Sequence, residues 1–449
     1  MSKKISRRDF LRFSAAAGMG LAVTSLVACA PTAAPTAAAG SPTMAPAAGN
    51  GNVFLNYWTG WSGNEFDALQ KSVDKYNAAN PKAFVNMTTV FGQYDKVLTA
   101  IAGGNPPDVV SAVWLHQLVS MAGRNGLTPL TPFAEKDGID GKAYWPNVWD
   151  GWHWNNQLWA LAISVDAATF VYRRDIFSEV GLDPNSPPKT VSDLDADNAK
   201  LEKIDASGNI QRVGMLPAGI YDWGRVYGGD WYDEGTKKFT LDQPQNIAAL
   251  DWIGSYYKRL GPDKVAAFTS GQGDFLSANN PFFAGLIAIY GAGEWMIHIV
   301  RDFAPTTQYD YLTYPYPDGG REKYTSFDGS VFTIPTGVKH ADAAWGFIKW
   351  LSEDANMADI DFAFQNIPPK QAVATSDRFI SDPRFKFNVD VYTGKNVFAP
   401  PKTPVTDQLF TSLAAAEDAV HQGTKTAAQA LKDAQTEVQT ALDKFNSKS

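Results

Sequence analysis

The feature that most constrains the fold of this chain is a long apolar stretch that carries one acid. Residues 159–177, WALAISVDAATFVYRRDIF, open as an almost unbroken apolar run, hold Asp166 in the middle and end in the charged residues 173–175. Such a run is typical of a strand that is buried on both faces. A buried carboxylate needs partners, so Asp166 either bonds backbone amides in an ordinary core or lines a cleft between two lobes and binds a polar ligand.

The length and charge of the chain limit what it can be. With 449 residues it exceeds the usual span of one hydrophobic core, so about two domains of ordinary size are expected. Its net charge of −8 gives no electrostatic case for binding nucleic acid or an anionic membrane surface. The 14 tryptophans are more than a core needs. Indoles often line surfaces that bind flat apolar faces, although most of these are expected to pack in the interior.

Cysteine and histidine are too sparse for several classes of site. The single cysteine, Cys29, excludes a disulfide framework or a thiolate metal site within one chain. The five histidines include no short ligand spacing such as HExxH. We therefore expect neither a metal site nor a cofactor.

The first 28 residues are expected to be an export signal and not part of the fold. A basic stretch precedes an apolar run at residues 13–28, which is shorter than the ~20 apolar residues of a spanning helix. Residues 6–12, SRRDFLR, match the twin-arginine pattern of proteins that are exported already folded. Residues 26–29, LVAC, resemble the bacterial lipobox, so Cys29 is the predicted lipidation site. A plain secretory signal with a chance cysteine is the alternative.

The segment after the signal is predicted to be a tether. Residues 29–52 are rich in Pro, Ala, Thr and Gly and contain no aromatic residue, so they cannot bury a core. Removal of residues 1–28 takes away five basic residues and one acidic residue, which leaves a net charge of −12. We expect an acidic, extracytoplasmic protein that is attached to the cell membrane only through its lipid anchor.

From residue 53 onward, strand and helix patterns alternate. Apolar runs predict strands at residues 53–58, 84–91 and 108–114, and helical spacing predicts helices at residues 66–76, 94–102 and 115–123. This alternation favours a parallel sheet whose ligand crevice lies at the carboxyl ends of the strands. The residues at those ends include Trp58, Trp61, Ser62 and Trp114.

Two further local patterns are strong. Trp152 and Trp154 alternate across a polar turn, which predicts a hairpin that leads into residues 159–177. Apolar residues between 427 and 445 recur every three or four positions, which predicts an amphipathic C-terminal helix whose alanines suit packing against a sheet.

Helix starts are also visible in the sequence. Ser62 with Glu65, and Thr426 with Gln429, have the spacing of a capping box, in which a side chain at each end of the first turn bonds a free backbone amide. A further helix at residues 191–204 is expected to be capped near Thr190 or Ser192.

In this order the segments resemble the bacterial extracellular solute-binding proteins of ABC importers, the family that includes maltose-binding protein. The resemblance covers the chain from residue 53 to its C-terminal end and rests on several motifs. These are GGNPPDVV at residues 103–110, the strand and helix at residues 160–177, GEW at residues 293–295 and ALKDAQT at residues 430–436. Ala162 and Arg173 depart from the family pattern, in which proline and asparagine are usual, and this affects ligand contacts there more than the fold.

The resemblance implies an α/β protein with the two-lobed periplasmic-binding-protein type II fold. Each lobe would be a mixed sheet flanked by helices, with a hinge between the lobes and the ligand held there. The implied boundaries are residues 53–163 with 329–366 for the first lobe, and residues 164–328 with 367–449 for the second.

Eleven residues are predicted to bind the ligand. Carried over by position from the family, Trp61, Ser62, Trp114, Asp166, Trp295 and Phe410 fall where its members contact ligand. Sugar rings offer apolar faces that stack on indoles and hydroxyls that bond carboxylates and amides, which adds further candidates. These are Trp58, Asn64, Asp222, Trp223 and Asp328. Few basic residues lie at these strand ends, which disfavours phosphorylated or carboxylated ligands.

The predicted function is therefore capture of a neutral sugar or oligosaccharide by a monomeric, non-enzymatic binding protein that passes it to the permease subunits of an ABC importer. A non-sugar polar solute, such as a polyol phosphate, is the main alternative. A carbohydrate-active enzyme is a second alternative, because paired carboxylates in a tryptophan-lined cleft also serve glycosidases. A lipid-anchored receptor without a transporter is a third.

Overall fold

The first lobe is built on a parallel sheet of three strands. The computed structural model describes residues 52–447, which all belong to one compact unit. In the first sheet β1 (Val53–Thr59) lies between β2 (Ala83–Thr89) and β3 (Val109–Ser111). Val53 is level with Ala83 and Tyr57 with Val109 in these two pairings. The predicted parallel sheet is confirmed, although β3 is shorter than the predicted strand.

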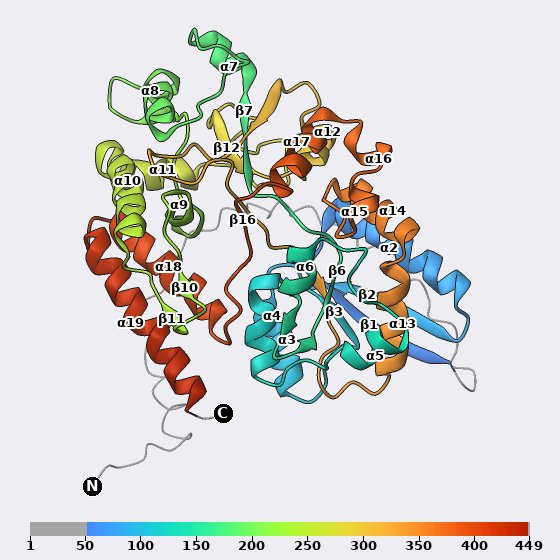
Figure 1. Ribbon diagram of the computed structural model, residues 1–449. Helices are drawn as coiled ribbons and strands as arrows, with labels where there is room; N and C mark the ends of the chain where they lie inside the picture. Colours follow the sequence, from blue (N-terminus) through green and yellow to red (C-terminus); the bar gives the residue numbers. More distant parts are fainter. Residues whose placement is uncertain (1–51, 448–449) are drawn as a thin grey trace, which may run out of the picture. The chain divides into compact units, whose positions relative to one another are not determined.

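Each strand of this sheet is followed by a helix. These are α2 (Gly63–Ala79), α3 (Tyr94–Ala102) and α4 (Leu115–Gly123), and the last two have the predicted bounds. Helices α13 (Ala341–Leu351) and α14 (Asp354–Phe364) return to this lobe late in the chain, where α14 packs against α2 (Figure 1). The carboxyl ends of the strands therefore meet the amino ends of the helices at one edge of the sheet.

Residues 159–177 do connect the two sheets, but as two strands and not one. Strand β6 (Leu161–Ala162) pairs antiparallel with β15 (Val331–Phe332) in the first lobe. Val165 then forms an isolated bridge with Ile367, and the Ala168 amide donates to the Ser326 carbonyl. The prediction of one continuous strand is wrong because the backbone changes partners three times along this segment.

The second sheet is antiparallel. Strand β7 (Thr169–Arg173) lies between β12 (Ile289–Ala292) and β13 (Tyr309–Leu312), and α7 (Arg174–Glu179) follows it directly. Side chains alternate along β7: Phe170 and Tyr172 join the core of the second lobe, whereas Val171 joins the larger core cluster on the other face. The strand is thus buried on both faces, as its sequence predicts.

Helices build most of the second lobe. Helices α18 (Thr406–His421) and α19 (Ala427–Asn446) lie side by side, with α10 (Pro244–Leu260) against both (Figure 1). The C-terminal helix α19 therefore packs mainly on helices and not on a sheet as predicted. Its buried alanines, Ala427, Ala430 and Ala434, allow the close approach of α18.

The remaining elements are short. The helices are α5 (Thr131–Lys136), α6 (Pro146–Gly151), α8 (Val191–Leu201), α9 (Ile220–Val226), α11 (Pro262–Ser270), α12 (Met296–Phe303), α15 (Gln371–Ala374), α16 (Asp377–Ile380) and α17 (Pro383–Tyr392). The remaining strands, of two or three residues each, form four pairs: β4 (His153–Trp154) with β5 (Gln157–Leu158), β8 (Lys203–Ile204) with β9 (Ile210–Arg212), β10 (Tyr232–Asp233) with β11 (Lys238–Phe239), and β14 (Thr325–Ser326) with β16 (Val397–Phe398). The first pair is the predicted tryptophan hairpin.

The predicted helix caps have different outcomes. Thr190 and Asp193 form a reciprocal capping box on α8, and the Thr426 hydroxyl accepts the Gln429 amide at the start of α19. Ser62, by contrast, makes no side-chain bond to the first turn of α2, so the capping box predicted there is wrong. Helix α8 also ends at Leu201, earlier than predicted, because the chain turns into β8.

Two classes of feature are absent from residues 52–447. No helix in this part of the chain is both long and apolar enough to cross a membrane. Within the same residues, no three His, Cys, Asp or Glu side chains come together as a metal site. The predicted signal, the lipidation site Cys29 and residues 29–51 of the predicted tether lie outside the described residues.

Candidate binding site

A cavity of about 600 Å³ lies at the carboxyl edge of the first sheet, beside the segments that connect the two sheets. Its walls come from the loops after β1, β2 and β3, from the connecting segments, and from the second lobe. The lining residues are Gly60, Trp61, Ser62, Glu65, Phe91, Trp114, Asp166, Asp274, Phe275, Leu276, Trp295 and Asn366. Five of the eleven predicted ligand-binding residues are therefore together: Trp61, Ser62, Trp114, Asp166 and Trp295.

Three indoles form part of the wall. The rings of Trp61 and Trp114 meet edge to face, with centroids 5.8 Å apart and planes at 68°. Trp295 comes from the second lobe, just before α12. Gly293 makes its conformation possible, because a Cβ at that position would lie 2.1 Å from the Trp295 ring. Indoles from both lobes thus line one space of the size that small-molecule sites have.

Two buried polar atoms on this wall have no hydrogen-bond partner among residues 52–447. They are the Nε1 donor of Trp61 and the Oδ1 acceptor of Asn366, and these residues are only 9% and 4% exposed. A buried polar group without a partner costs about 1–3 kcal/mol. A ligand hydroxyl group that reached either atom would relieve the cost at that atom.

Asp166 is held by a chain of polar contacts that runs away from the cavity. Its Oδ1 accepts the backbone amide of Asp328 at 2.8 Å. The Asp328 carboxylate in turn accepts the His116 backbone amide at 3.2 Å and contacts the His116 ring at Nδ1. The contacts between the Asp328 side chain and His116 therefore hold the Asp328 backbone amide in position to bond Asp166.

The pKa values of Asp166 and His116 are shifted by burial and by neighbouring charges. Burial and the neighbouring charge of Asp328 raise the pKa of Asp166 to about 7. For His116, burial acts to lower the pKa, but the carboxylate of Asp328 outweighs it, so the pKa is raised. Near neutral pH, Asp166 can thus present either a protonated or an ionised carboxyl group to the cavity.

Glu65 adds a second carboxyl group to the wall. The glutamate does not cap α2 as predicted; its Oε1 lies 3.6 Å from Nε2 of His298 on α12. Burial raises the pKa of Glu65 to about 7 and lowers that of His298 to about 4. Near pH 6 both groups are therefore mainly uncharged, and the contact joins helices from the two lobes without an ion pair.

Four predicted residues lie outside the cavity wall with a visible role elsewhere. Trp58 is half-buried beneath Lys96, whose Nζ lies 5.0 Å from the ring centroid. Asn64 donates from Nδ2 to Asp302 on α12 at 3.2 Å. Asp222 accepts hydrogen bonds from Ser326 Oγ at 2.6 Å and from the Tyr324 hydroxyl at 2.9 Å. Asp328, as described, supports Asp166 from behind.

Two aromatic predictions meet other surroundings. Trp223 has no exposed surface and packs in the core of the second lobe, 4.5 Å between ring centroids from Trp252, so the prediction that it contacts ligand is not met in this structure. Phe410 lies on α18 between the rings of His116 and Tyr221, at centroid distances of 4.7 and 4.4 Å. It lines a separate, smaller cavity of about 310 Å³.

Several lining residues were not predicted. Phe91 follows β2, so the rule that points to strand ends would have found it. Glu65 is predicted only as part of a capping box, and residue 366 only as the boundary of the first lobe. The segment containing Asp274, Phe275 and Leu276 is an irregular loop without a periodic pattern, so nothing in the sequence indicated it.

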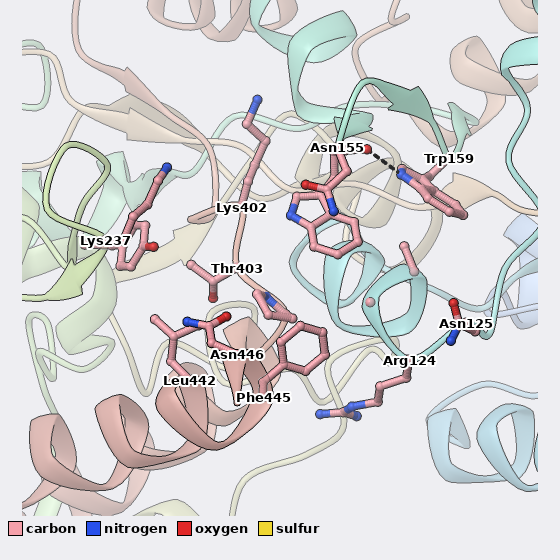
Figure 2. A pocket seen from close by; sticks show the side chains of 15 residues that line it. Arg124, Asn125, Asn155, Trp159, Lys237, Lys402, Thr403, Leu442, Phe445 and Asn446 are labelled. Carbon is pink, nitrogen blue, oxygen red and sulfur yellow. Dashed lines mark hydrogen bonds between the residues drawn. The ribbon is translucent and has the colours of Figure 1, made fainter. Parts of the chain in front are cut away.

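A second and larger cavity lies elsewhere among the described residues. It measures about 850 Å³ and lies beside the C-terminal end of α4, the β4–β5 hairpin and the end of α19 (Figure 2). Its cations already have partners: Arg124 with Asp407, Lys237 with Glu234 and Lys402 with Asp150, at 3.0, 2.9 and 2.8 Å. Figure 2 shows Lys237 and Lys402 on one side of this space and Arg124 on another. The 600 Å³ cavity, which has indoles and unpaired polar atoms in its wall, is the better candidate site.

Comparison with known families agrees with this architecture. Residues 71–387 match the family described as bacterial extracellular solute-binding protein, and residues 4–24 match the twin-arginine translocation signal. The first match spans more than half of the chain, so the chain belongs to this family. It is a solute-binding protein of the ABC transporter type and not an enzyme. Its signal and family indicate export to the extracytoplasmic space.

Some relatives match most of this chain, and others match only about a third of it. The maltotriose-binding protein of Pyrococcus abyssi is 23% identical over 79% of this chain and 74% of its own length. The sn-glycerol-3-phosphate-binding periplasmic protein UgpB of Escherichia coli is 30% identical, over only 34% of this chain and 35% of its own. The solved structure of CpMnBP1 with mannobiose bound has a TM-score of 0.81 and 28% identity, covering 86% of this chain and all of that one.

Proposed function

We propose that the protein captures a neutral saccharide in the 600 Å³ cavity and delivers it, unaltered, to the permease of an ABC importer. The observation that carries this proposal is the pairing of indole faces with an unmatched donor and an unmatched acceptor on one wall. A sugar ring has apolar faces that stack on indoles. Its hydroxyl groups both donate and accept hydrogen bonds, so they suit Trp61 Nε1 and Asn366 Oδ1.

The charge of the wall supports a neutral ligand over an anionic one. The twelve lining residues include three carboxyl groups, on Glu65, Asp166 and Asp274, and no lysine, arginine or histidine. A phosphate or carboxylate would find no cationic partner there and would be repelled by any ionised carboxylate. Maltotriose and mannobiose, the sugars of two relatives with long coverage, are neutral, whereas the sn-glycerol-3-phosphate-binding relative matches only a third of the chain.

We also infer the boundaries of the two lobes, the oligomeric state and the way the protein is anchored. Lobe one comprises residues 53–163 and 329–366, and lobe two residues 164–328 and 367–449; the pairing of β6 with β15 and the Val165–Ile367 bridge lie near these boundaries. The mature protein acts as a monomer anchored through a lipid on Cys29. The lobes close on the ligand because it contacts both of them at once.

A thermal-shift and calorimetry screen tests the proposal. Mannobiose, maltotriose, mannitol and sn-glycerol 3-phosphate are added to the purified protein, and the recovered ligand is analysed for cleavage. A ligand at 100 times its dissociation constant stabilises the protein by about 2.7 kcal/mol. We expect at least one neutral saccharide to bind and to be recovered intact. Stabilisation by the phosphate alone, or release of shorter sugars, would contradict the proposal.

Two tryptophans at neighbouring strand ends provide a matched pair of variants. Trp114 lines the cavity and Trp58 does not, although both are half-buried. We expect Trp114→Ala to weaken saccharide binding roughly tenfold or more, because it removes an apolar ring face from the ligand. Trp58→Ala should leave the affinity within about threefold of the wild type. Equal effects of the two variants in calorimetry would place the ligand elsewhere.

A further inference from the structure

Exposed phenylalanines gather at the candidate site. Only four large apolar side chains among the described residues are strongly exposed: Phe91 at 59%, Ile204 at 49%, and Phe275 and Phe362 at 39% each. Phe91 and Phe275 both line the 600 Å³ cavity. Isolated exposed apolar residues need no explanation, but two on the wall of one cavity indicate a surface that binds something apolar.

The two phenylalanines come from different lobes. Phe91 lies in the turn between β2 and α3, which belong to the first sheet and its helices. Phe275 lies in the long connection between α11 and β12, and β12 is an edge strand of the second sheet. A ligand that contacts both rings therefore contacts both lobes.

The loop that carries Phe275 is held in place by a buried asparagine. Asn280 has no exposed surface; its Nδ2 donates to the Phe275 carbonyl at 2.9 Å and its Oδ1 accepts the Phe282 amide at 2.9 Å. The Ser277 hydroxyl closes the turn by donating to the Asp274 carbonyl at 2.7 Å. These bonds fix residues 274–277 locally, so the loop does not depend on a ligand for its shape.

Two further features give the loop its position. Gly273 lies so close to the returning chain that a Cβ there would be 2.3 Å from the Asn279 carbonyl oxygen. The Phe275 ring stacks on Tyr290 of β12, with centroids 6.4 Å apart and planes at 25°. The loop is thus attached to the second sheet through an aromatic contact while Phe275 keeps exposed surface at the cavity.

We propose that residues 273–280, which we call the selectivity loop, make the site prefer saccharides of two or more rings over monosaccharides. The inference rests on the proposed function and deepens it. Five aromatic side chains line the cavity: Trp61, Phe91, Trp114, Phe275 and Trp295. One sugar ring has only two faces, so it cannot stack on all of them. Phe91 and Phe275 stack on a second sugar ring, and the neighbouring carboxyl group of Asp274 accepts hydrogen bonds from the hydroxyl groups of that ring.

Calorimetry on Phe275→Ala tests the selectivity loop, with Phe362→Ala as its control. Both phenylalanines are 39% exposed, but Phe362 lies outside the cavity, so the two substitutions remove similar surface from different places. The ligands are mannobiose and maltotriose, compared with mannose and glucose. We expect Phe275→Ala to weaken binding of the longer sugar about tenfold and of its monosaccharide less than threefold, and Phe362→Ala to change neither.

Asn280 is a positioning residue, and a conservative variant separates its role from general stability. Asn280→Asp keeps the acceptor for the Phe282 amide but loses the Nδ2 donor to the Phe275 carbonyl. We expect it to reproduce the selectivity change of Phe275→Ala, whereas a merely structural role would weaken short and long sugars alike. Asn86→Asp, the same change at an exposed position of β2 outside the loop and the cavity wall, should leave selectivity unchanged.

The outcomes distinguish the two proposals. If the wild-type protein binds none of the saccharides, the proposed function fails and the selectivity loop fails with it. If it binds an oligosaccharide and Phe275→Ala binds equally well, only the selectivity loop is refuted. An equal loss for one-ring and multi-ring sugars would refute the preference for longer ligands. A loss confined to the longer sugars supports it.

Discussion

The carboxyl group of Asp166 holds its proton until about neutral pH, because burial and the nearby charge of Asp328 raise its pKa to about 7. Between pH 4 and 7 the folded protein therefore binds this proton more tightly than the unfolded chain does. The resulting contribution to the free energy of unfolding is fully present at the acidic end of this range and is lost as the pH rises through 7. The same carboxyl group faces the cavity, so one residue affects both stability and ligand binding.

Asp166→Asn removes this titration while keeping an oxygen that accepts the Asp328 amide. We expect the fall in the free energy of unfolding between pH 4.5 and 7.5 to become smaller by roughly 3 kcal/mol, because the pKa of Asp166 is raised from 3.8 to about 7. Urea unfolding at the two pH values measures it, with the exposed Asp67→Asn as the control. An unchanged difference would mean that Asp166 ionises normally. At pH 7.5, where the Asp166 carboxyl group is mainly ionised, the variant should also bind saccharide about tenfold more weakly, since it loses a charged hydrogen-bond acceptor.

At the scale of elements, two helix starts with the same sequence signature have different roles. Thr190 forms a capping box on α8, whereas Ser62 leaves the first turn of α2 without a side-chain cap and lines the cavity. An N-cap threonine or serine usually satisfies one of the free amides of the first turn. The amino end of α2 instead lies at the candidate site, where a ligand can approach it.

Thr190→Ala should consequently affect mainly the stability of the protein, and Ser62→Ala mainly its binding of ligand. We expect Thr190→Ala to lower the free energy of unfolding by about 1 kcal/mol and to leave saccharide affinity unchanged. Ser62→Ala should change stability by less than about 0.5 kcal/mol and weaken binding several-fold. Chemical denaturation and calorimetry on both variants measure the two quantities. Destabilisation by Ser62→Ala as large as that by Thr190→Ala would show that Ser62 caps α2 after all.

For the whole molecule, the segments that connect the lobes are joined by one buried acid. Glu294 has no exposed surface and accepts the backbone amides of Ala167 at 3.1 Å and Ile367 at 3.3 Å. Burial and the nearby charge of Asp166 raise its pKa well above the usual value. One side chain therefore bonds two different connecting segments directly beside the cavity, and links the position of each to the other.

Glu294→Ala is expected to be strongly destabilising, because it leaves the buried Ala167 amide without an acceptor and the Ile367 amide with only the Val165 carbonyl. The loss should be about 2–4 kcal/mol in urea unfolding. Glu294→Gln keeps one carbonyl oxygen of nearly the same shape and should lose less than half as much. If the two substitutions are equally harmful, the charge or proton of Glu294 matters more than its acceptor role.

Local signals in the sequence predicted a large part of this fold. The bounds of α3 and α4, the tryptophan hairpin and the Thr190 cap follow from spacing within a few residues, because helix and hairpin geometry depends on near neighbours. The strand-end rule also placed Trp61 and Trp114 at the candidate site, since parallel strands end at the same edge. The family resemblance supplied the two lobes and drew attention to Trp295.

Only the tertiary structure decided which predicted residues meet. Trp223 and Trp114 are both tryptophans that are predicted to bind the ligand, yet one is wholly buried in a core and the other lines the cavity. Phe275 lies in a loop with no periodicity, and it reaches the site because Asn280 and Tyr290 hold that loop there. Periodicity reports contacts between residues close in the chain. The cavity wall joins segments from Gly60 to Asn366, and their meeting depends on the path of the connecting segments, which spacing along the sequence does not encode.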